Sequence, residues 1–295
     1  MNNKEKVIII AEIGECYSGD LNIAKKLMQE SKNTGCDYVK FQTLDYENIS
    51  DDDPEKDWCE KIALKPETIK ILMEYAREIE CRILFTPENI KTAKWLLEAG
   101  CREIKIASSS ITDESLLGFI NDKFKIVFMS TGMASLDEVN NAIGRLNKIS
   151  DLFVMHCISE YPFGPLLEQR GLRALSSSDI NLNMMKMLMA LYPGIKVGYS
   201  DHTDGILAPV AAVAAGAQVI EKHITLDRKT PVENFLQNKE FLGTDHVLSI
   251  EPKELNKMVL QIREVERMFG EWKWERSDGE KLLMDLCRGR FDETA

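Results

Sequence analysis

Residues 198–228 read GYSDHTDGILAPVAAVAAGAQVIEKHITLDR and hold two of the chain's four histidines, His202 and His223, on either side of a run of small apolar residues. A short strand-like segment precedes each histidine, and the apolar run between them has the length of a helix. A strand, a helix and a second strand in this order form a parallel βαβ unit. The two histidines are therefore expected at neighbouring strand ends.

The same alternation of β-branched runs and amphipathic segments continues from end to end of the chain. We count eight strand runs, which are KVIIIAEIG, DYVKFQT, RILFTP, EIKIASS, KIVFMSTG, LFVMHCIS, KVGYSD and QVIEKHITL. Eight strand–helix units predict a (β/α)8 barrel of the TIM type over residues 1–270, followed by a tail, residues 271–295, that is too short for a second domain. A doubly wound open sheet is the alternative, because counting strands does not show whether the sheet closes.

The composition restricts the class of protein. With 295 residues, 44% hydrophobic and 29% charged, the chain is long enough for one large core and resembles soluble globular proteins. No apolar run approaches the roughly 20 residues that cross a membrane, and no signal-peptide pattern is present, so a cytoplasmic protein is expected. A net charge of −11 without a basic stripe disfavours nucleic-acid binding. The seven cysteines are scattered and never spaced as CxxC, which predicts free thiols.

Polar residues gather at the predicted carboxyl ends of the strands, where barrel enzymes carry their chemistry. They are Glu12, Lys40, Thr86, Lys105, Ser108, Ser130, Ser159, Tyr161, Ser200, His202, Glu221 and His223. A lysine inside an apolar strand, as in DYVKFQ and EIKIAS, is costly to bury without a partner. Lys40 and Lys105 therefore predict an anion between them, although a lone lysine in a strand more often points to solvent.

The two histidines also predict a metal site. Alternation along a strand puts Ser200 with His202, and Glu221 with His223, on one face of each strand. Neighbouring parallel strands lie about 4.8 Å apart, which brings the two imidazoles within reach of one ion. Neutral imidazole suits Mn²⁺, Zn²⁺ or Fe²⁺, and two protein ligands leave positions open for water and substrate. A hydrogen-bonded core role for each histidine is the alternative.

Several motifs occur in the order, and at nearly the intervals, found in the N-acetylneuraminate (sialic acid) synthases. They are AEIG, GDLNIAKKLM, DYVKFQT, FTP, KIASS, STGM, HCISEYP, GYSDHT, GAQVIEKHITLDR and GTDHVLSIEP. The chain resembles this family of TIM barrels, whose members condense phosphoenolpyruvate with an N-acetylated amino sugar, release phosphate and form a nine-carbon 2-keto acid. The resemblance implies a phosphoenolpyruvate-dependent synthase that acts on N-acetylmannosamine or a similar sugar.

The resemblance also implies roles for single residues. His202 and His223 would bind a divalent cation, typically Mn²⁺, with Mg²⁺ or Co²⁺ as alternatives. Glu12, Lys40 and Lys105 would be catalytic, with Glu12 activating a water molecule. The residues implied to hold phosphoenolpyruvate are Lys40, Thr86, Lys105, Ser108, Ser130, Ser159 and Ser200. Those implied to face the sugar are Tyr161 and Asp245.

The chain departs from the family where the sugar is expected to bind. It reads CYSGD at residues 16–20 where the family usually has NHNGD, and Ser110 replaces an expected glutamate. An extra segment, residues 232–242, is expected to cover the site. The family's antifreeze-like domain is not expected after the barrel, which leaves a monomer or a homodimer joined through barrel surfaces. The alternatives to sialic acid synthesis are a legionaminic or pseudaminic acid synthase, and a non-catalytic barrel that binds a partner enzyme.

Overall fold

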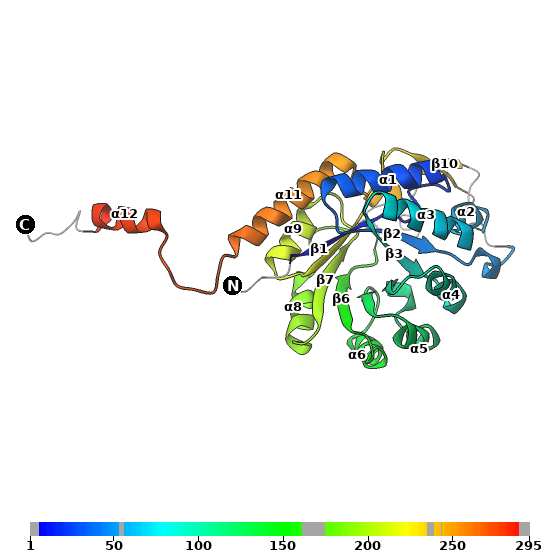
Figure 1. The fold of residues 1–295 in the computed structure, drawn as a ribbon, viewed down its shortest axis with the longest axis horizontal. Helices are drawn as coiled ribbons and strands as arrows, with labels where there is room; N and C mark the ends of the chain where they lie inside the picture. Colours follow the sequence, from blue (N-terminus) through cyan, green and yellow to red (C-terminus); the bar gives the residue numbers. More distant parts are fainter. Residues whose placement is uncertain (1–5, 53–55, 161–174, 235–238, 243, 289–295) are drawn as a thin grey trace, which may run out of the picture.

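The structure is a computed structural model that describes residues 6–52, 56–160, 175–234, 239–242 and 244–288. Eight parallel strands form one sheet at its centre (Figure 1). They are β1 (Ile8–Glu12), β2 (Tyr38–Thr43), β3 (Arg82–Pro87), β4 (Glu103–Ile106), β5 (Ile126–Ser130), β6 (Asp151–Cys157), β7 (Lys196–Asp201) and β8 (Val219–His223). Their order is β3-β2-β1-β8-β7-β6-β5-β4, and β3 contacts β4, so the sheet closes into a nearly complete barrel. The predicted (β/α)8 barrel is confirmed, and the open doubly wound sheet is wrong.

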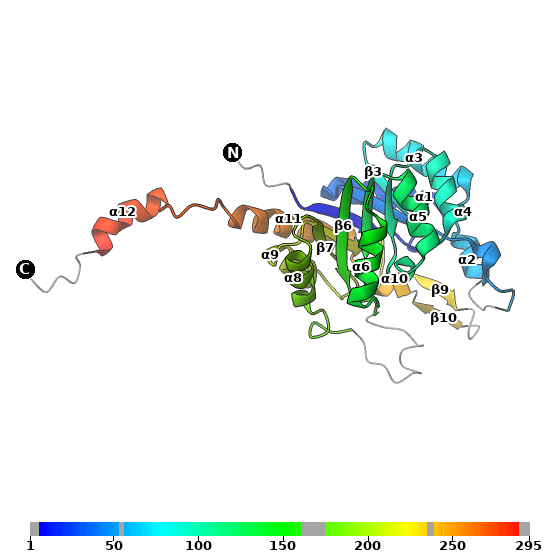
Figure 2. The same cartoon turned by 90° about the horizontal axis from the view of Figure 1, so that it is seen from below.

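Helices cover the outside of the barrel (Figures 1 and 2). In chain order the helices that follow the strands are α1 (Leu21–Thr34), α3 (Pro66–Glu78), α4 (Ile90–Glu98), α5 (Glu114–Lys123), α6 (Leu136–Arg145), α8 (Leu182–Leu191), α9 (Leu207–Ala214) and α11 (Pro252–Met268). Local chemistry sets their ends. The Asp20 carboxylate accepts hydrogen bonds from the amides of Asn22 and Ile23 at the start of α1, and Gly35, with φ of 87°, ends it.

The inside of the barrel has an apolar floor and a polar upper layer. A cluster of inward-facing side chains forms the floor: Ile10, Tyr38, Leu84, Phe128, Phe153, Met155 and Val219. Side chains alternate across a strand, so the residues two positions further along point to the same side. Glu12, Lys40, Thr86, Ser130 and Glu221 stand in that relation to members of the floor. Period-two alternation therefore delivers a ring of polar groups to the carboxyl end of the barrel.

Shorter elements build the rim at that end. They are the 3-10 turns η1 (Tyr46–Asn48) and η2 (Ser108–Ser110), and the helices α2 (Lys56–Ile62) and α10 (Thr244–Leu248). In the connection after β8, β9 (Pro231–Asn234) and β10 (Lys239–Leu242) pair as an antiparallel ladder. Each of these strands is only four residues long, which is too short for a sequence pattern to reveal it. The covering role expected of residues 232–242 stays a prediction.

The chain leaves the barrel after α11. Helix α12 (Asp278–Cys287) lies away from the barrel in both views (Figures 1 and 2). Its amino end is closed by Ser277, whose side chain accepts a hydrogen bond from the amide of Glu280, and Trp272 and Trp274 before it are fully exposed. Among the described helices none combines the length and the hydropathy needed to cross a membrane.

Candidate active site

A cavity of about 280 Å³ opens at the carboxyl ends of the barrel strands. All the predicted site residues line it except Tyr161, which lies outside the described residues, and Asp245. The lining residues are Glu12, Lys40, Gln42, Thr86, Lys105, Ala107, Ser108, Ser109, Ser130, Met133, Cys157, Ser159, Ser200, His202, Glu221 and His223. Residues from all eight strands or the turns after them therefore converge on one small space.

Lys40 lies between two carboxylates at the base of this cavity. Its Nζ is 3.1 Å from Oε2 of Glu12 and 3.5 Å from Oε1 of Glu221, and it donates a hydrogen bond of 3.0 Å to Oγ1 of Thr86. Only 3% of Lys40 is exposed, and Glu12 is fully buried. Burial lowers the pKa of Lys40, but the two carboxylates outweigh it and raise the pKa. Lys40 is therefore held in its charged form.

Lys105 lies on β4, and its Nζ approaches Glu221, the carboxylate that also pairs with Lys40. Its Nζ lies 3.3 Å from Oε1 of Glu221, which also accepts a 3.0 Å hydrogen bond from Oγ of Ser200. Burial raises the pKa of Glu221, but Lys105 and Lys40 lower it to about 2. Burial and the neighbouring Lys40 lower the pKa of Lys105, although Glu221 opposes this. Glu221 was expected on the face of β8 that carries His223, but its pairing with both lysines was not predicted.

Glu12 differs from Glu221 although both are buried carboxylates. Burial raises the pKa of Glu12, and the attraction of Lys40 only partly offsets this. Its Oε1 accepts a 2.8 Å hydrogen bond from Nε2 of Gln42, a cavity residue that was not predicted. The two carboxylates thus differ, since the pKa of Glu221 is lowered and the pKa of Glu12 is raised.

Serine hydroxyls form the wall around the lysines. Oγ of Ser108 accepts a 3.0 Å hydrogen bond from the amide of Gly132. A Cβ at position 132 would overlap Oγ of Ser159, which explains why glycine follows Thr131 here. The buried Oγ of Ser130 has no hydrogen-bond partner in the described parts of the chain. That hydroxyl is available to a ligand, as the prediction of an anion site requires.

The two histidines predicted to share a metal lie side by side. The ring centroids of His202 and His223 are 5.4 Å apart, and the rings are inclined at 71°. Burial, reinforced by His223, lowers the pKa of His202 to about 4, so its imidazole is neutral at ordinary pH. Burial also lowers the pKa of His223, but Asp245 outweighs it and raises the pKa. The described residues contain no cluster of three or more His, Cys, Asp or Glu suited to a metal, and two imidazoles alone would leave most coordination positions of a cation open.

Asp245 lies behind His223 instead of lining the cavity, although it was expected to face the sugar. Its Oδ2 is 3.4 Å from Nδ1 of His223 and accepts a 3.2 Å hydrogen bond from the amide of Glu15. Gly14, with φ of 51°, makes room for it, since a Cβ there would overlap that oxygen. Burial raises the pKa of Asp245, but His223 lowers it to about 2. A carboxylate behind a histidine sets the orientation of the ring, which leaves Nε2 for the cavity.

The remaining two histidines lie outside the cavity. Nε2 of His156 is 2.7 Å from the carbonyl oxygen of Ile180 and only 1% of His156 is exposed, so this histidine has a hydrogen-bonded core role. Nδ1 of His246 is 2.7 Å from Oγ1 of Thr225, and only 1% of His246 is exposed. His246 is therefore a buried residue of α10 that lies outside the cavity.

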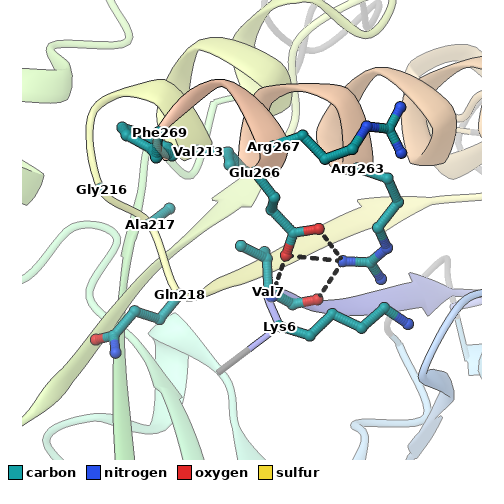
Figure 3. A pocket seen from close by; sticks show the side chains of 10 residues that line it. All are labelled: Lys6, Val7, Val213, Gly216, Ala217, Gln218, Arg263, Glu266, Arg267 and Phe269. Carbon is teal, nitrogen blue, oxygen red and sulfur yellow. Dashed lines mark hydrogen bonds and ion pairs between the residues drawn. The ribbon is translucent and has the colours of Figure 1, made fainter. Parts of the chain in front are cut away.

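A larger hollow, of about 820 Å³, lies at the opposite end of the barrel between α9, α11 and the amino ends of β1 and β8 (Figure 3). Val213 and Phe269 lie together on one side of it (Figure 3). Arg263 donates to the carbonyl oxygen of Val7 at 2.8 Å and pairs with Glu266 at 3.1 Å. Since this arginine is already paired and the walls are largely apolar, the smaller cavity is the candidate active site.

Comparison with known proteins agrees with this geometry. Residues 27–274 match the NeuB family. The chain belongs to the NeuB family. N,N'-diacetyllegionaminic acid synthase of Campylobacter jejuni is 33% identical over 96% of this chain and 84% of that protein, and the mouse N-acetylneuraminate-9-phosphate synthase is 30% identical over 92% and 73%.

A solved structure supports the same assignment of this NeuB-family chain. The sialic acid synthetase of Leptospira borgpetersenii, in complex with citrate, superposes with a TM-score of 0.80 at 30% identity, and the match covers 97% of this chain and 94% of that protein. The resemblance to sialic acid synthases, inferred from the motifs, is therefore confirmed at the level of the family and of the barrel.

Proposed function

We propose that this NeuB-family chain condenses phosphoenolpyruvate with an amino sugar to form a nonulosonic acid, with release of phosphate. The observation that carries the proposal is the pair of buried lysines, Lys40 and Lys105, in a cavity that also contains two adjacent imidazoles. Relatives named as legionaminic, sialic and pseudaminic acid synthases support the reaction class. Phosphoenolpyruvate and an amino sugar are the expected small-molecule partners.

The lysines and serines suit the phosphate and carboxylate of phosphoenolpyruvate. Lys40 and Lys105 supply two cations in a space that excludes most water, where charge-assisted hydrogen bonds are strong. Ser130 and Ser200 add hydroxyl donors from β5 and β7. The complex of the Leptospira relative with citrate, a small polyanion, is consistent with an anion-binding barrel.

We further propose that His202 and His223 hold a divalent cation, Mn²⁺ with Mg²⁺ or Co²⁺ as alternatives. The neutral His202 and the carboxylate behind His223 suit that role. When bound, such a cation supplies Lewis-acid activation of the aldehyde oxygen of the sugar. His223 lies beside Glu12, its register partner in the β1–β8 ladder.

Glu12 is positioned to act as the general base. Its raised pKa matches a group that takes a proton from water as the water adds to C2 of phosphoenolpyruvate. Lys40 holds one oxygen of Glu12 and Gln42 the second, so the carboxylate has a fixed direction. The chain's own groups thus bind the donor substrate, orient the base and receive the proton.

The identity of the acceptor sugar depends on residues 16–20, where the chain departs from the family. Tyr17, which stands at the family's usual histidine, is buried and donates to the carbonyl oxygen of Ile62, and Sγ of Cys16 lies 3.4 Å from Oγ of Ser249. These side chains pack under the rim, so they contribute no polar groups to the sugar. The relatives named N,N'-diacetyllegionaminic acid synthases are 33% identical, against 30% for the mammalian N-acetylneuraminate-9-phosphate synthases, which favours a legionaminic-type, di-N-acetylated sugar over N-acetylmannosamine. Synthesis of pseudaminic acid and a non-catalytic role beside a partner enzyme are the competing functions.

Phosphate release tests the proposal. The full chain is incubated with phosphoenolpyruvate and Mn²⁺ against N-acetylmannosamine and di-N-acetylated amino sugars, and inorganic phosphate is measured. We expect release that depends on the sugar and is lost in Lys105→Met. A lack of release with every sugar, together with retained phosphoenolpyruvate binding, would instead support the non-catalytic barrel. Light scattering of the same sample decides between a monomer and the proposed homodimer through barrel surfaces.

A further inference from the structure

A second pair of buried charges lies on the outer face of the strands that carry the two histidines. Nζ of Lys222 is 2.7 Å from Oδ2 of Asp201, and neither residue has any exposed surface. The two are register partners in the β7–β8 ladder. Because side chains alternate across a strand, this pair points away from the cavity, while Ser200 and Glu221 point into it.

The pair holds the backbone on both sides of His202, because Asp201 precedes this histidine and both members of the pair bind Thr203 after it. Oδ1 of Asp201 accepts a 3.1 Å hydrogen bond from the amide of Thr203, and Nζ of Lys222 donates to the carbonyl oxygen of Thr203. Tyr199 donates to Oδ1 of Asp201 at 2.8 Å. Both backbone polar groups of the residue after His202 are therefore bound to this pair.

The same lysine immediately precedes His223. Lys222 belongs to β8, which ends at His223, whereas the backbone that it holds belongs to the bend after β7. One side chain thus links the position of His223 to the position of His202. Without this link, only the bend after β7 would fix the position of the His202 side chain.

We propose that Asp201 and Lys222 are positioning residues, which set the separation of the two imidazoles and thereby the affinity of the site for its cation. The inference rests on the proposed function, since it concerns the metal site. A buried ion pair is a weak source of stability, because desolvation offsets most of its attraction. What this pair supplies is directional hydrogen bonding, here to the backbone N–H and C=O groups of Thr203, the residue that follows His202.

The test replaces both charges at once, so that no single buried charge is left behind. The variant carries Asp201→Asn and Lys222→Met, which keep the volumes close to the originals. The matched control carries Asp151→Asn and Lys196→Met, which remove a 3.2 Å pair between β6 and the amino end of β7. Mn²⁺ affinity is measured by titration of the metal-free full chain, Co²⁺ absorption reports the geometry of the site, and phosphoenolpyruvate affinity is measured without metal.

We expect the double variant to bind Mn²⁺ about 10- to 100-fold more weakly, the usual effect of disturbing groups behind metal ligands. Its Co²⁺ spectrum should change, while phosphoenolpyruvate affinity should stay as in the control, because Lys40 and Lys105 lie on different strands. Mn²⁺ affinity equal to that of the control overturns the inference and leaves the proposed function intact. If the unaltered chain binds no Mn²⁺ through His202 and His223, the metal site of the proposed function fails and the inference fails with it.

Tyr199→Phe keeps the test decisive if the double variant does not fold. This change removes one hydrogen bond to Asp201 and keeps the ring. We expect about 5-fold weaker Mn²⁺ binding from the loss of one such bond. An unchanged Mn²⁺ affinity in this variant would contradict the positioning role.

Discussion

Replacing Lys105 by methionine is the most direct test of the anion site. The change keeps the length of the side chain but removes the charge, and Lys105 is only 2% exposed. Glu221 keeps Lys40 at 3.5 Å and the hydrogen bond from Ser200 at 3.0 Å, so its charge remains compensated. We therefore expect the barrel to stay folded and phosphoenolpyruvate binding to weaken.

The structure sets the size of the effect. At an effective dielectric constant of about 20, unit charges 3.3 Å apart, the distance from Lys105 to Glu221, interact by about 5 kcal/mol. A phosphate oxygen near Lys105 gains a similar attraction but competes with Glu221 for the same Nζ. A net loss of about 3 kcal/mol remains, which matches the low end of values for removing one partner of a buried charge pair and corresponds to roughly 150-fold weaker binding.

Calorimetric titration of phosphoenolpyruvate into the purified chain measures this loss, with thermal unfolding monitored in parallel. Lys196→Met is the matched control, because that lysine is part of a partly exposed pair at the opposite end of β7. Binding to the folded Lys105→Met chain with the affinity of the control would refute the reasoning. A loss of binding in both variants would point to a general effect of charge instead of a site.

Four further predictions concern the proton, the metal and the tail. Because burial raises the pKa of Glu12, this general base becomes protonated as pH falls, so the rate of phosphate release should fall as pH drops through that raised pKa. A pH–rate profile of the unaltered chain checks this, and a rate that does not change with pH contradicts it. His202 is neutral at ordinary pH, whereas Asp245 raises the pKa of His223, so Mn²⁺ affinity should fall as pH drops through the pKa of His223. His202→Ala and His223→Ala should each abolish Mn²⁺ binding in elemental analysis. Stoichiometric metal in both variants would refute the proposed metal site. A chain that ends at Gly270 should keep its unfolding temperature and its affinity for phosphoenolpyruvate, since no described residue after it lines the cavity, and a marked fall in either would make the tail part of the barrel's function.

Much of the candidate site follows from local pattern. Period-two alternation in the short strands puts Lys40 and Glu12 on the same side as the apolar floor residues Tyr38 and Ile10. Gly14, Ser108, Gly132 and Ser159 each follow a strand by two residues, where turns begin, so the polar residues at these strand ends are predicted to meet at one edge. The fold class and most residues of the cavity could be predicted on this basis, because strand alternation and helix capping depend on neighbours in the chain.

Only the tertiary structure decided which groups face one another. Lys105 and Glu221 are 116 positions apart, and their contact depends on closure of the barrel and on the register of every ladder between β4 and β8. The same closure placed Asp245 of α10 behind His223, where its Oδ2 accepts a hydrogen bond from the amide of Glu15. By itself the sequence determined the strands, their inward faces and the chemical types at their ends. Partners and pKa values depend on distances of a few ångströms across the barrel, which the sequence alone does not specify.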